Sequence, residues 1–160
     1  MQAKIINFTL NGKNIDVMVS PMTTLQVLLR EDLGYTATKM GCKQGGCGSC
    51  TVLVNGEPMV SCLLPVEDVA DQEVVTLEGL MVDGELHVVQ ETFHETFATQ
   101  CGYCTPGMII VSKALLDKNP NPSREEVMDA LTGNYCRCTG YEPIVRAVIE
   151  SATRMTGAGN

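Results

Sequence analysis

The first half of the chain alternates apolar and polar residues in short runs, the pattern of half-buried β-strands. Two pairs of these runs flank an Asn-Gly dipeptide, which two-residue hairpin turns prefer, at Asn11-Gly12 and at Asn55-Gly56. The strands predicted in this way cover residues 5–10, 15–19, 51–54, 59–62 and 73–77. Between the hairpins, residues 21–33 predict one helix with Thr23 or Thr24 as its N-cap. A small sheet with one helix packed across it follows from this pattern.

The second half of the chain changes to the period of about 3.6 residues that is typical of amphipathic helices. The predicted helices cover residues 87–98, 106–119, 123–131 and 142–155. Ser123 and Glu126 form a capping-box pattern at the start of the third helix. The predicted fold class is therefore α+β, with a sheet domain over residues 1–78 and an all-α four-helix domain over residues 79–160.

Composition and charge narrow the possible functions. With 160 residues, 44% of them hydrophobic, the chain is large enough to build a core. Eleven basic residues against nineteen acidic ones give a net charge of −8. This charge argues against a nucleic-acid partner, because too few cationic side chains are available to neutralise the phosphates of a nucleic acid. We find no apolar run of about 18 residues and no secretory signal pattern, so we expect a cytoplasmic protein without membrane insertion.

The eight cysteines carry the candidate chemistry. They fall into a first tetrad, Cys42, Cys47, Cys50 and Cys62, and a second tetrad, Cys101, Cys104, Cys136 and Cys138. An even number of cysteines also allows disulfides, but a chain of this length without an export signal is expected to keep its thiols reduced. Two groups of four thiols therefore favour two metal or cluster sites over disulfides or buried apolar thiols.

The first tetrad has the spacing C-x4-C-x2-C followed by a fourth cysteine, which matches plant-type ferredoxins. A [2Fe–2S] cluster on four thiolates is an anion, so it requires hydrogen-bond donors directed at sulfur. The glycine-rich loop of residues 41–48 allows the backbone N–H groups to turn inward around such a cluster. A zinc knuckle is the alternative, although zinc ribbons usually pair two C-x2-C motifs and only one is present here.

The second tetrad, with the spacing C-x2-C-x31-C-x1-C, leaves a cluster and a four-cysteine zinc site both open. Cys101 and Cys104 precede the helix predicted at residue 106, and Cys136 and Cys138 precede the helix predicted at residue 142. Both pairs are thus expected near helix N-termini, where free N–H groups and the positive end of the dipole favour an anion.

Three runs, read together, resemble a known family. GCKQGGCGSCTV at residues 41–52, QCGYCTPGM at residues 100–108 and GNYCRCTGY at residues 133–141 occur in this order. They resemble the iron–sulfur subunit of the molybdenum hydroxylases, the family of xanthine dehydrogenase, aldehyde oxidoreductase and carbon monoxide dehydrogenase. The resemblance implies a β-grasp ferredoxin-like domain followed by a helical domain, each holding one [2Fe–2S] cluster on its tetrad.

The resemblance also implies partners. It predicts a large subunit with molybdopterin, in its cytosine dinucleotide form, and a medium subunit with FAD, assembled as a dimer of heterotrimers. The chain would relay single electrons between the molybdenum centre and the flavin, and Gln100 and Cys138 would approach the pterin. The alternatives are a free-standing two-cluster ferredoxin and a zinc-stabilised adaptor. A subunit needs an exposed docking patch, for which Met81, Val82 and the glycine-rich C-terminal region are candidates.

Other residues near the motifs carry smaller predictions. Ser49 and Lys43 depart from the residues common in the family, and we expect a hydroxyl and a cation there to stabilise the reduced form of the first cluster. His87 and His94 are expected on the solvated face of a helix rather than at a metal. We find no nucleophile–base pair and no phosphate-binding loop, so no catalytic residue is predicted in this chain.

Overall fold

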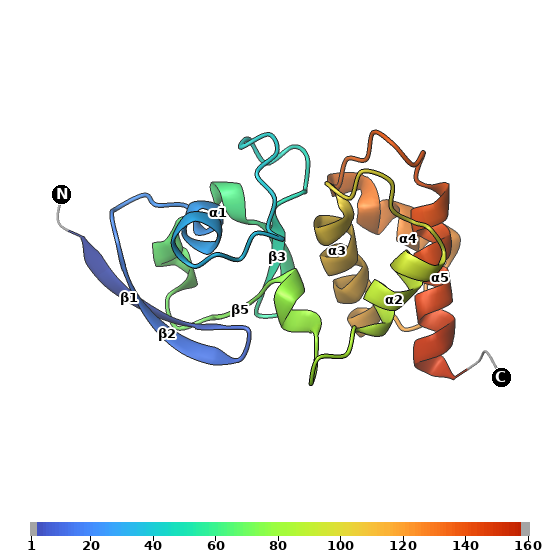
Figure 1. The fold of residues 1–160 in the computed structure, drawn as a ribbon, viewed down its shortest axis with the longest axis horizontal. Helices are drawn as coiled ribbons and strands as arrows, with labels where there is room; N and C mark the ends of the chain where they lie inside the picture. Colours follow the sequence, from blue (N-terminus) through green and yellow to red (C-terminus); the bar gives the residue numbers. More distant parts are fainter. Residues whose placement is uncertain (1–2, 158–160) are drawn as a thin grey trace.

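A five-stranded sheet and a group of helices follow one another along the chain in the computed structural model, which describes residues 3–157 (Figure 1). The strands are β1 (Lys4–Leu10), β2 (Lys13–Val19), β3 (Thr51–Val54), β4 (Glu57–Val60) and β5 (Glu73–Val75). They lie in the order β2-β1-β5-β3-β4, with β1 and β5 parallel and the other neighbours antiparallel. This sheet, crossed by one helix, is the predicted β-grasp arrangement, and the helices that follow confirm the α+β class.

Both predicted hairpins are present. At the turn between β1 and β2, Asn11 and Gly12 have φ of 50° and 76°, the left-handed values that this turn type requires. Two strand ends were predicted too far along the chain. The strand predicted over 59–62 ends at Val60, because residues Ser61–Leu63 form a 3₁₀ turn that holds Cys62. The strand predicted over 73–77 ends at Val75.

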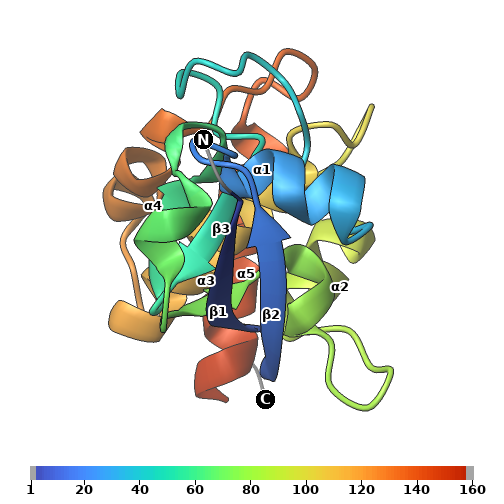
Figure 2. The same cartoon turned by 90° about the vertical axis from the view of Figure 1, so that its left-hand side faces the viewer.

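The helix on the sheet is shorter than predicted. It consists of α1 (Leu25–Val27) and a π-helical turn over Leu28–Asp32, rather than residues 21–33. Thr24 is the N-cap, and its side chain accepts a hydrogen bond from the amide of Val27. Met22 has a φ of 66° and cannot belong to a right-handed helix. This short helix lies across the face of the sheet, as Figure 2 shows, and buries its leucines against the strands.

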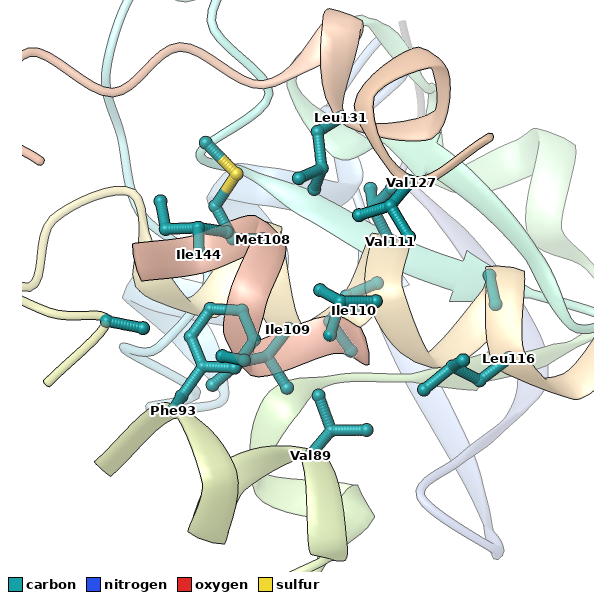
Figure 3. Close-up of a cluster of buried hydrophobic side chains, with 14 of the residues drawn as sticks. Val89, Phe93, Met108, Ile109, Ile110, Val111, Leu116, Val127, Leu131 and Ile144 are labelled. Carbon is teal, nitrogen blue, oxygen red and sulfur yellow. The ribbon is translucent and has the colours of Figure 1, made fainter. Parts of the chain in front are cut away.

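Four helices form the second half: α2 (Val88–Glu95), α3 (Thr105–Lys118), α4 (Arg124–Ala130) and α5 (Glu142–Thr156). The apolar side chains of α3, among them Met108 and Ile110, are surrounded by Phe93, Val127 and Ile144 from the other three helices (Figure 3). The capping box at Ser123 and Glu126 is present as predicted. None of the helices in residues 3–157 is long and apolar enough to span a membrane.

The prediction for the start and end of α2 was wrong. The helix covers 88–95 instead of 87–98, because Phe97 adopts a left-handed φ of 54° and closes the helix. His87 is not on the solvated face. It is a half-buried N-cap whose Nδ1 accepts a hydrogen bond from the amide of Val89 at 3.2 Å. His94 is exposed, as expected.

The helices and the sheet share an apolar contact. Leu53 of β3 is buried in the same hydrophobic cluster as α3, and Val75 and Leu77 pack against that cluster. In both views the loop before β3 and the loops before α3 and α5 emerge at the same end of the molecule (Figures 1 and 2). These three loops carry seven of the eight cysteines, and the pairing of β3 with β4 brings the eighth to the same end.

Candidate metal centres

The two buried cysteines of the first tetrad are placed by the second hairpin. Thr51 of β3 pairs with Val60 of β4. Cys50 directly precedes Thr51, and the 3₁₀ turn that follows Val60 brings Cys62 beside Cys50. The Ser61 hydroxyl donates to the Cys50 carbonyl oxygen at 2.7 Å and fixes this end of the hairpin. Burial raises the pKa of the Cys50 thiol to about 11, so a neutral thiol is favoured unless a cation binds the sulfur.

The other two cysteines of the first tetrad, Cys42 and Cys47, lie beside each other in the glycine-rich loop. The Gln44 amide donates to the Cys42 sulfur at 3.4 Å, and the amides of Gly46 and Cys47 also face it. This hydrogen bond from Gln44, followed by the neighbouring Cys47 side chain, lowers the pKa of the Cys42 thiol to about 7. The inward-facing N–H groups predicted from the loop composition are therefore confirmed.

The second tetrad is assembled from the loops before α3 and α5. Cys104 lies at the N-terminus of α3, as predicted, where it is the N-cap residue, and it lies beside Cys136. Cys101 lies beside Cys138. Burial, reinforced by the adjacent Cys136, raises the pKa of the Cys104 thiol to about 12. The second tetrad thus contains two adjacent thiol pairs, as the first one does.

Two hydroxyl groups approach the sulfurs. The Ser49 oxygen, which is buried, lies 3.1 Å from the Cys47 sulfur. The Thr139 oxygen lies 3.1 Å from the Cys136 sulfur and accepts a hydrogen bond from the Tyr141 amide at 3.1 Å. Burial opposes ionisation of Cys136, yet the Thr139 hydroxyl and nearby amides lower the pKa of its thiol below the ordinary value.

The two tetrads face a common space. A cavity of about 250 Å³ is lined by Cys42 and Cys47 of the first tetrad and by all four cysteines of the second. Tyr103 and Tyr135 also line it. A third tyrosine near the second tetrad, Tyr141, accepts a hydrogen bond from the Cys136 amide at 2.8 Å.

The donor set fits binuclear clusters. In a [2Fe–2S] cluster four thiolates bind two irons, so two thiolates serve each iron. Each tetrad here offers two adjacent thiol pairs together with N–H or O–H groups directed at sulfur. All eight cysteines are free thiols. Within residues 3–157, no three His, Cys, Asp or Glu side chains converge on one point as a mononuclear site requires.

Gln100, which was predicted to approach the pterin, is exposed in the loop between α2 and α3, next to the exposed pair of Cys101 and Cys138. Sequence reasoning left two other residues of the site unidentified. Thr139 was not predicted, although a hydroxyl residue directly after a candidate ligand was a usable signal. The buried side chain of Asn134, which reaches the loop of the first tetrad, was also missed. No local sequence pattern predicts a contact between residues so far apart in the chain.

Comparisons with known proteins agree with this geometry. Residues 8–78 match the family described as 2Fe-2S iron-sulfur cluster binding domain, and residues 76–149 match the [2Fe-2S] binding domain family. The chain is 49% identical over 143 residues to the nicotinate dehydrogenase small FeS subunit of Eubacterium barkeri, covering 89% of this chain and 91% of the relative. It is 40% identical over 152 residues to the aldehyde oxidoreductase of Megalodesulfovibrio gigas, covering 93% of this chain but 17% of that longer protein.

A solved structure supports the same assignment. The crystal structure of quinoline 2-oxidoreductase from Pseudomonas putida 86 superposes with a TM-score of 0.93 at 42% identity, covering 99% of each chain. Similarity at this level extends over both the sheet and the helices, and so includes the loops that carry the two tetrads. The chain belongs to the family of iron–sulfur subunits of molybdenum-dependent oxidoreductase complexes, the molybdenum hydroxylases.

Proposed function

We propose that this chain holds two [2Fe–2S] clusters and relays single electrons between a molybdenum centre and a flavin carried by partner subunits. The first cluster would be held by the first tetrad, within residues 1–78, and the second cluster by the second tetrad, within residues 79–160. When bound, such clusters supply one-electron redox chemistry. This chain would hold them, orient them and adjust the charge around them.

The observation that carries the proposal is the arrangement of the thiols in four adjacent pairs, two in each tetrad. Two pairs match the ligands of two irons, and the two tetrads open on one cavity. The donors directed at Cys42 and Cys136 would offset the negative charge of thiolate-bound clusters.

Gln100 and Cys138 are the proposed points of approach to the molybdopterin, which is expected in its cytosine dinucleotide form. Both residues are exposed, and Cys138 lies beside the exposed Cys101. By contrast, Cys50 and Cys62 of the first tetrad are buried. An electron donor in another subunit can therefore come close to the second tetrad through Cys101 and Cys138, which supports the second cluster as the one next to the pterin.

The proposed assembly has a large molybdopterin subunit and a medium FAD subunit, arranged as a dimer of heterotrimers in the cytoplasm. Met81 and Val82, the candidate docking residues, are exposed at 43% and 68%, which suits a surface that a partner covers. The last residues of the glycine-rich C-terminal region, 158–160, lie outside the described residues. The substrate would be bound by the large subunit, beside the molybdopterin.

Iron content and electron paramagnetic resonance test the proposal in the anaerobically purified native complex. We expect four irons per copy of this chain and, after reduction with dithionite, two distinct signals of equal intensity. Cys47→Ser should remove one signal and Cys104→Ser the other. Zinc without iron would support a zinc-stabilised adaptor instead. A native chain that elutes alone at its mass of 17.3 kDa would support a free-standing carrier.

A further inference from the structure

A buried side chain joins the loops of the two tetrads. Asn134 is only 4% exposed, and its Nδ2 donates a hydrogen bond to the Gly48 carbonyl oxygen at 3.0 Å. Gly48 directly follows Cys47 of the first tetrad, and Asn134 precedes Cys136 of the second tetrad by two residues. The contact spans 86 positions of sequence. It therefore fixes one ligand loop relative to the other.

The Gly48 carbonyl oxygen is the centre of this contact between the two loops, which we call the junction. It also accepts hydrogen bonds from the Thr51 amide at 3.1 Å and from the Thr51 hydroxyl at 2.7 Å. All of these groups are buried. A buried carbonyl with several donors holds its position, because moving it would leave those buried donors unsatisfied. The loop of the first tetrad is thus held at this point from its own domain and from the helical domain.

Two glycines allow the close approach. A side chain at Gly107, in the first turn of α3, would collide with the Gly48 carbonyl oxygen. A Cβ at Gly48, where φ is +66°, would lie 2.5 Å from the Gly133 carbonyl oxygen and 2.7 Å from Asn134 Nδ2. Neither position can accept even a methyl group without separating the loops. By contrast, a Cβ at Gly133 would meet nothing within 4 Å.

The junction aligns a direct backbone link between the tetrads. The Tyr135 amide donates a hydrogen bond to the Cys47 carbonyl oxygen at 3.0 Å. Because Tyr135 is bonded to Cys136, a continuous path of covalent bonds, interrupted by this one hydrogen bond, runs from the Cys47 sulfur to the Cys136 sulfur. The residues on either side of this link, Gly48 and Asn134, are the ones that the junction joins.

We propose that Asn134 is a positioning residue that, with Gly48 and Gly107, sets the spacing and the backbone link through which the two tetrads exchange electrons. The inference rests on the proposed function, because it requires a cluster on each tetrad. One electron leaves one site and arrives at the other, and no proton moves and no bond in this chain breaks. A purely structural role for Asn134 would affect folding and iron content but not the coupling between correctly loaded sites.

The test uses the assembled complex with Asn134→Leu, Asn134→Ser and Gly107→Ala, and Gly133→Ala as the matched control. We expect each of the three test variants, provided that it retains four irons, to lose the magnetic splitting between the two reduced clusters. Electron equilibration between the clusters after pulse reduction should slow several-fold, while both midpoint potentials stay unchanged. Gly133→Ala should behave like the parent protein.

The milder Asn134→Ser keeps the test decisive if the larger substitutions prevent folding. Fully loaded Asn134→Ser or Gly107→Ala with the parental splitting and the parental rate would overturn the inference. The same changes in Gly133→Ala would overturn it too, because the effect would then not depend on the junction. A parent complex with fewer than two clusters would instead refute the proposed function, and the iron determination distinguishes that result from the others.

Discussion

The Ser49 hydroxyl oxygen lies 3.1 Å from the Cys47 sulfur, inside a loop that buries Ser49 almost completely. An iron-bound thiolate can only accept a hydrogen bond, so with a cluster present the hydroxyl must be the donor. A Cβ at Gly41 would lie 2.7 Å from this hydroxyl and 2.8 Å from the sulfur, so the glycine leaves room for the contact. The hydroxyl expected beside the first cluster therefore faces the Cys47 sulfur.

Replacement of Ser49 should lower the potential of the first cluster. A donor stabilises the reduced cluster more than the oxidised one, because reduction adds negative charge. In Ser49→Ala we expect the midpoint potential to fall by about 40 mV, equivalent to roughly 1 kcal/mol of hydrogen-bond energy in a one-electron couple. Redox titration followed by electron paramagnetic resonance measures this shift, and the second cluster in the same protein is the control.

Lys43 tests the contribution of charge separately. Its backbone is left-handed, with φ of 56°, and its side chain is exposed beside Cys42. Lys43→Glu should lower the potential of the first cluster at low ionic strength, and the shift should shrink in about 1 M salt, where the screening length is near 3 Å. Unchanged midpoints in both Lys43→Glu and Ser49→Ala would show that neither group influences the cluster.

Thr139 should act on the second cluster in the same way. Its oxygen accepts the Tyr141 amide, which leaves the hydroxyl proton free for the Cys136 sulfur. Thr139→Val keeps the shape of the side chain but removes the donor, so we expect the potential of the second cluster to fall by about 40 mV. Thr139→Ser should retain the parental value. A shift in the first cluster, with none in the second, would contradict the assignment.

His87 should make the stability of the helical domain depend on pH. Burial lowers the pKa of His87 in the fold, where the neutral ring caps α2 by accepting the Val89 amide. A lowered pKa means that the stabilisation is complete above the unfolded value of about 6.5 and is lost as pH falls through the folded value. The loss should be about 1 kcal/mol, typical of an N-cap.

Chemical unfolding at pH 7.5 and at pH 5.5 measures this effect. Other groups also titrate in this range, so the comparison is with His87→Asn, which keeps a capping acceptor but cannot gain a proton there. The parent should lose more unfolding free energy than His87→Asn between the two pH values. The exposed His94, replaced by asparagine, provides a second control that should behave like the parent. Equal losses in all three proteins would exclude His87 as the cause.

Phe97→Gly should stabilise the protein. Phe97 follows α2 with a φ of 54°, and the Ala98 amide returns to the Phe93 carbonyl at 3.0 Å, a helix end at which glycine is the preferred residue. The phenyl ring is 83% exposed, so its removal sacrifices little packing. Relief of the left-handed strain exceeds the added entropy of glycine in the unfolded chain, and we expect a gain of roughly 0.5–1 kcal/mol.

The melting temperature of the loaded chain measures this gain, with an expected rise of about 1–4 °C for a chain of this size. Phe97→Ala is the matched control, since it removes the ring but retains the Cβ that makes the left-handed conformation costly. It should show no comparable rise. A lower melting temperature for Phe97→Gly would mean that the exposed ring contributes more packing than its exposure suggests.

Local signals explain how much of the fold could be predicted. The Asn11-Gly12 turn and the Ser123–Glu126 capping box are complete within four residues, and both were identified correctly. The extent of the helix on the sheet was not, because Met22 is left-handed and the predicted start at residue 21 failed. The N-cap is Thr24, one of the two residues predicted for it, which also pairs with Pro65 in an isolated bridge.

In the candidate site, too, local patterns were predicted from the sequence and contacts between distant residues were not. Cysteine spacing along the chain indicated the two tetrads, but it could not indicate which thiols become neighbours. The side chain of Cys101 makes its hydrogen-bond contact with Cys138, although Cys104 is its nearest cysteine in the sequence. That arrangement depends on two loops from different helices meeting in space. The contact of Asn134 with Gly48 has the same origin, and no periodic or spacing pattern encodes it.

The burial of Leu53 among the side chains of the helical domain limits how the molecule can work. A swing of one domain away from the other would expose this leucine and its neighbours to water, at about 25 cal/mol for each Å² uncovered. A mechanism in which one domain moves back and forth to carry electrons is therefore disfavoured in this chain. The two tetrads stay at a fixed separation, so the rate of electron transfer between them would depend on distance and bonding rather than on the diffusion of a moving domain.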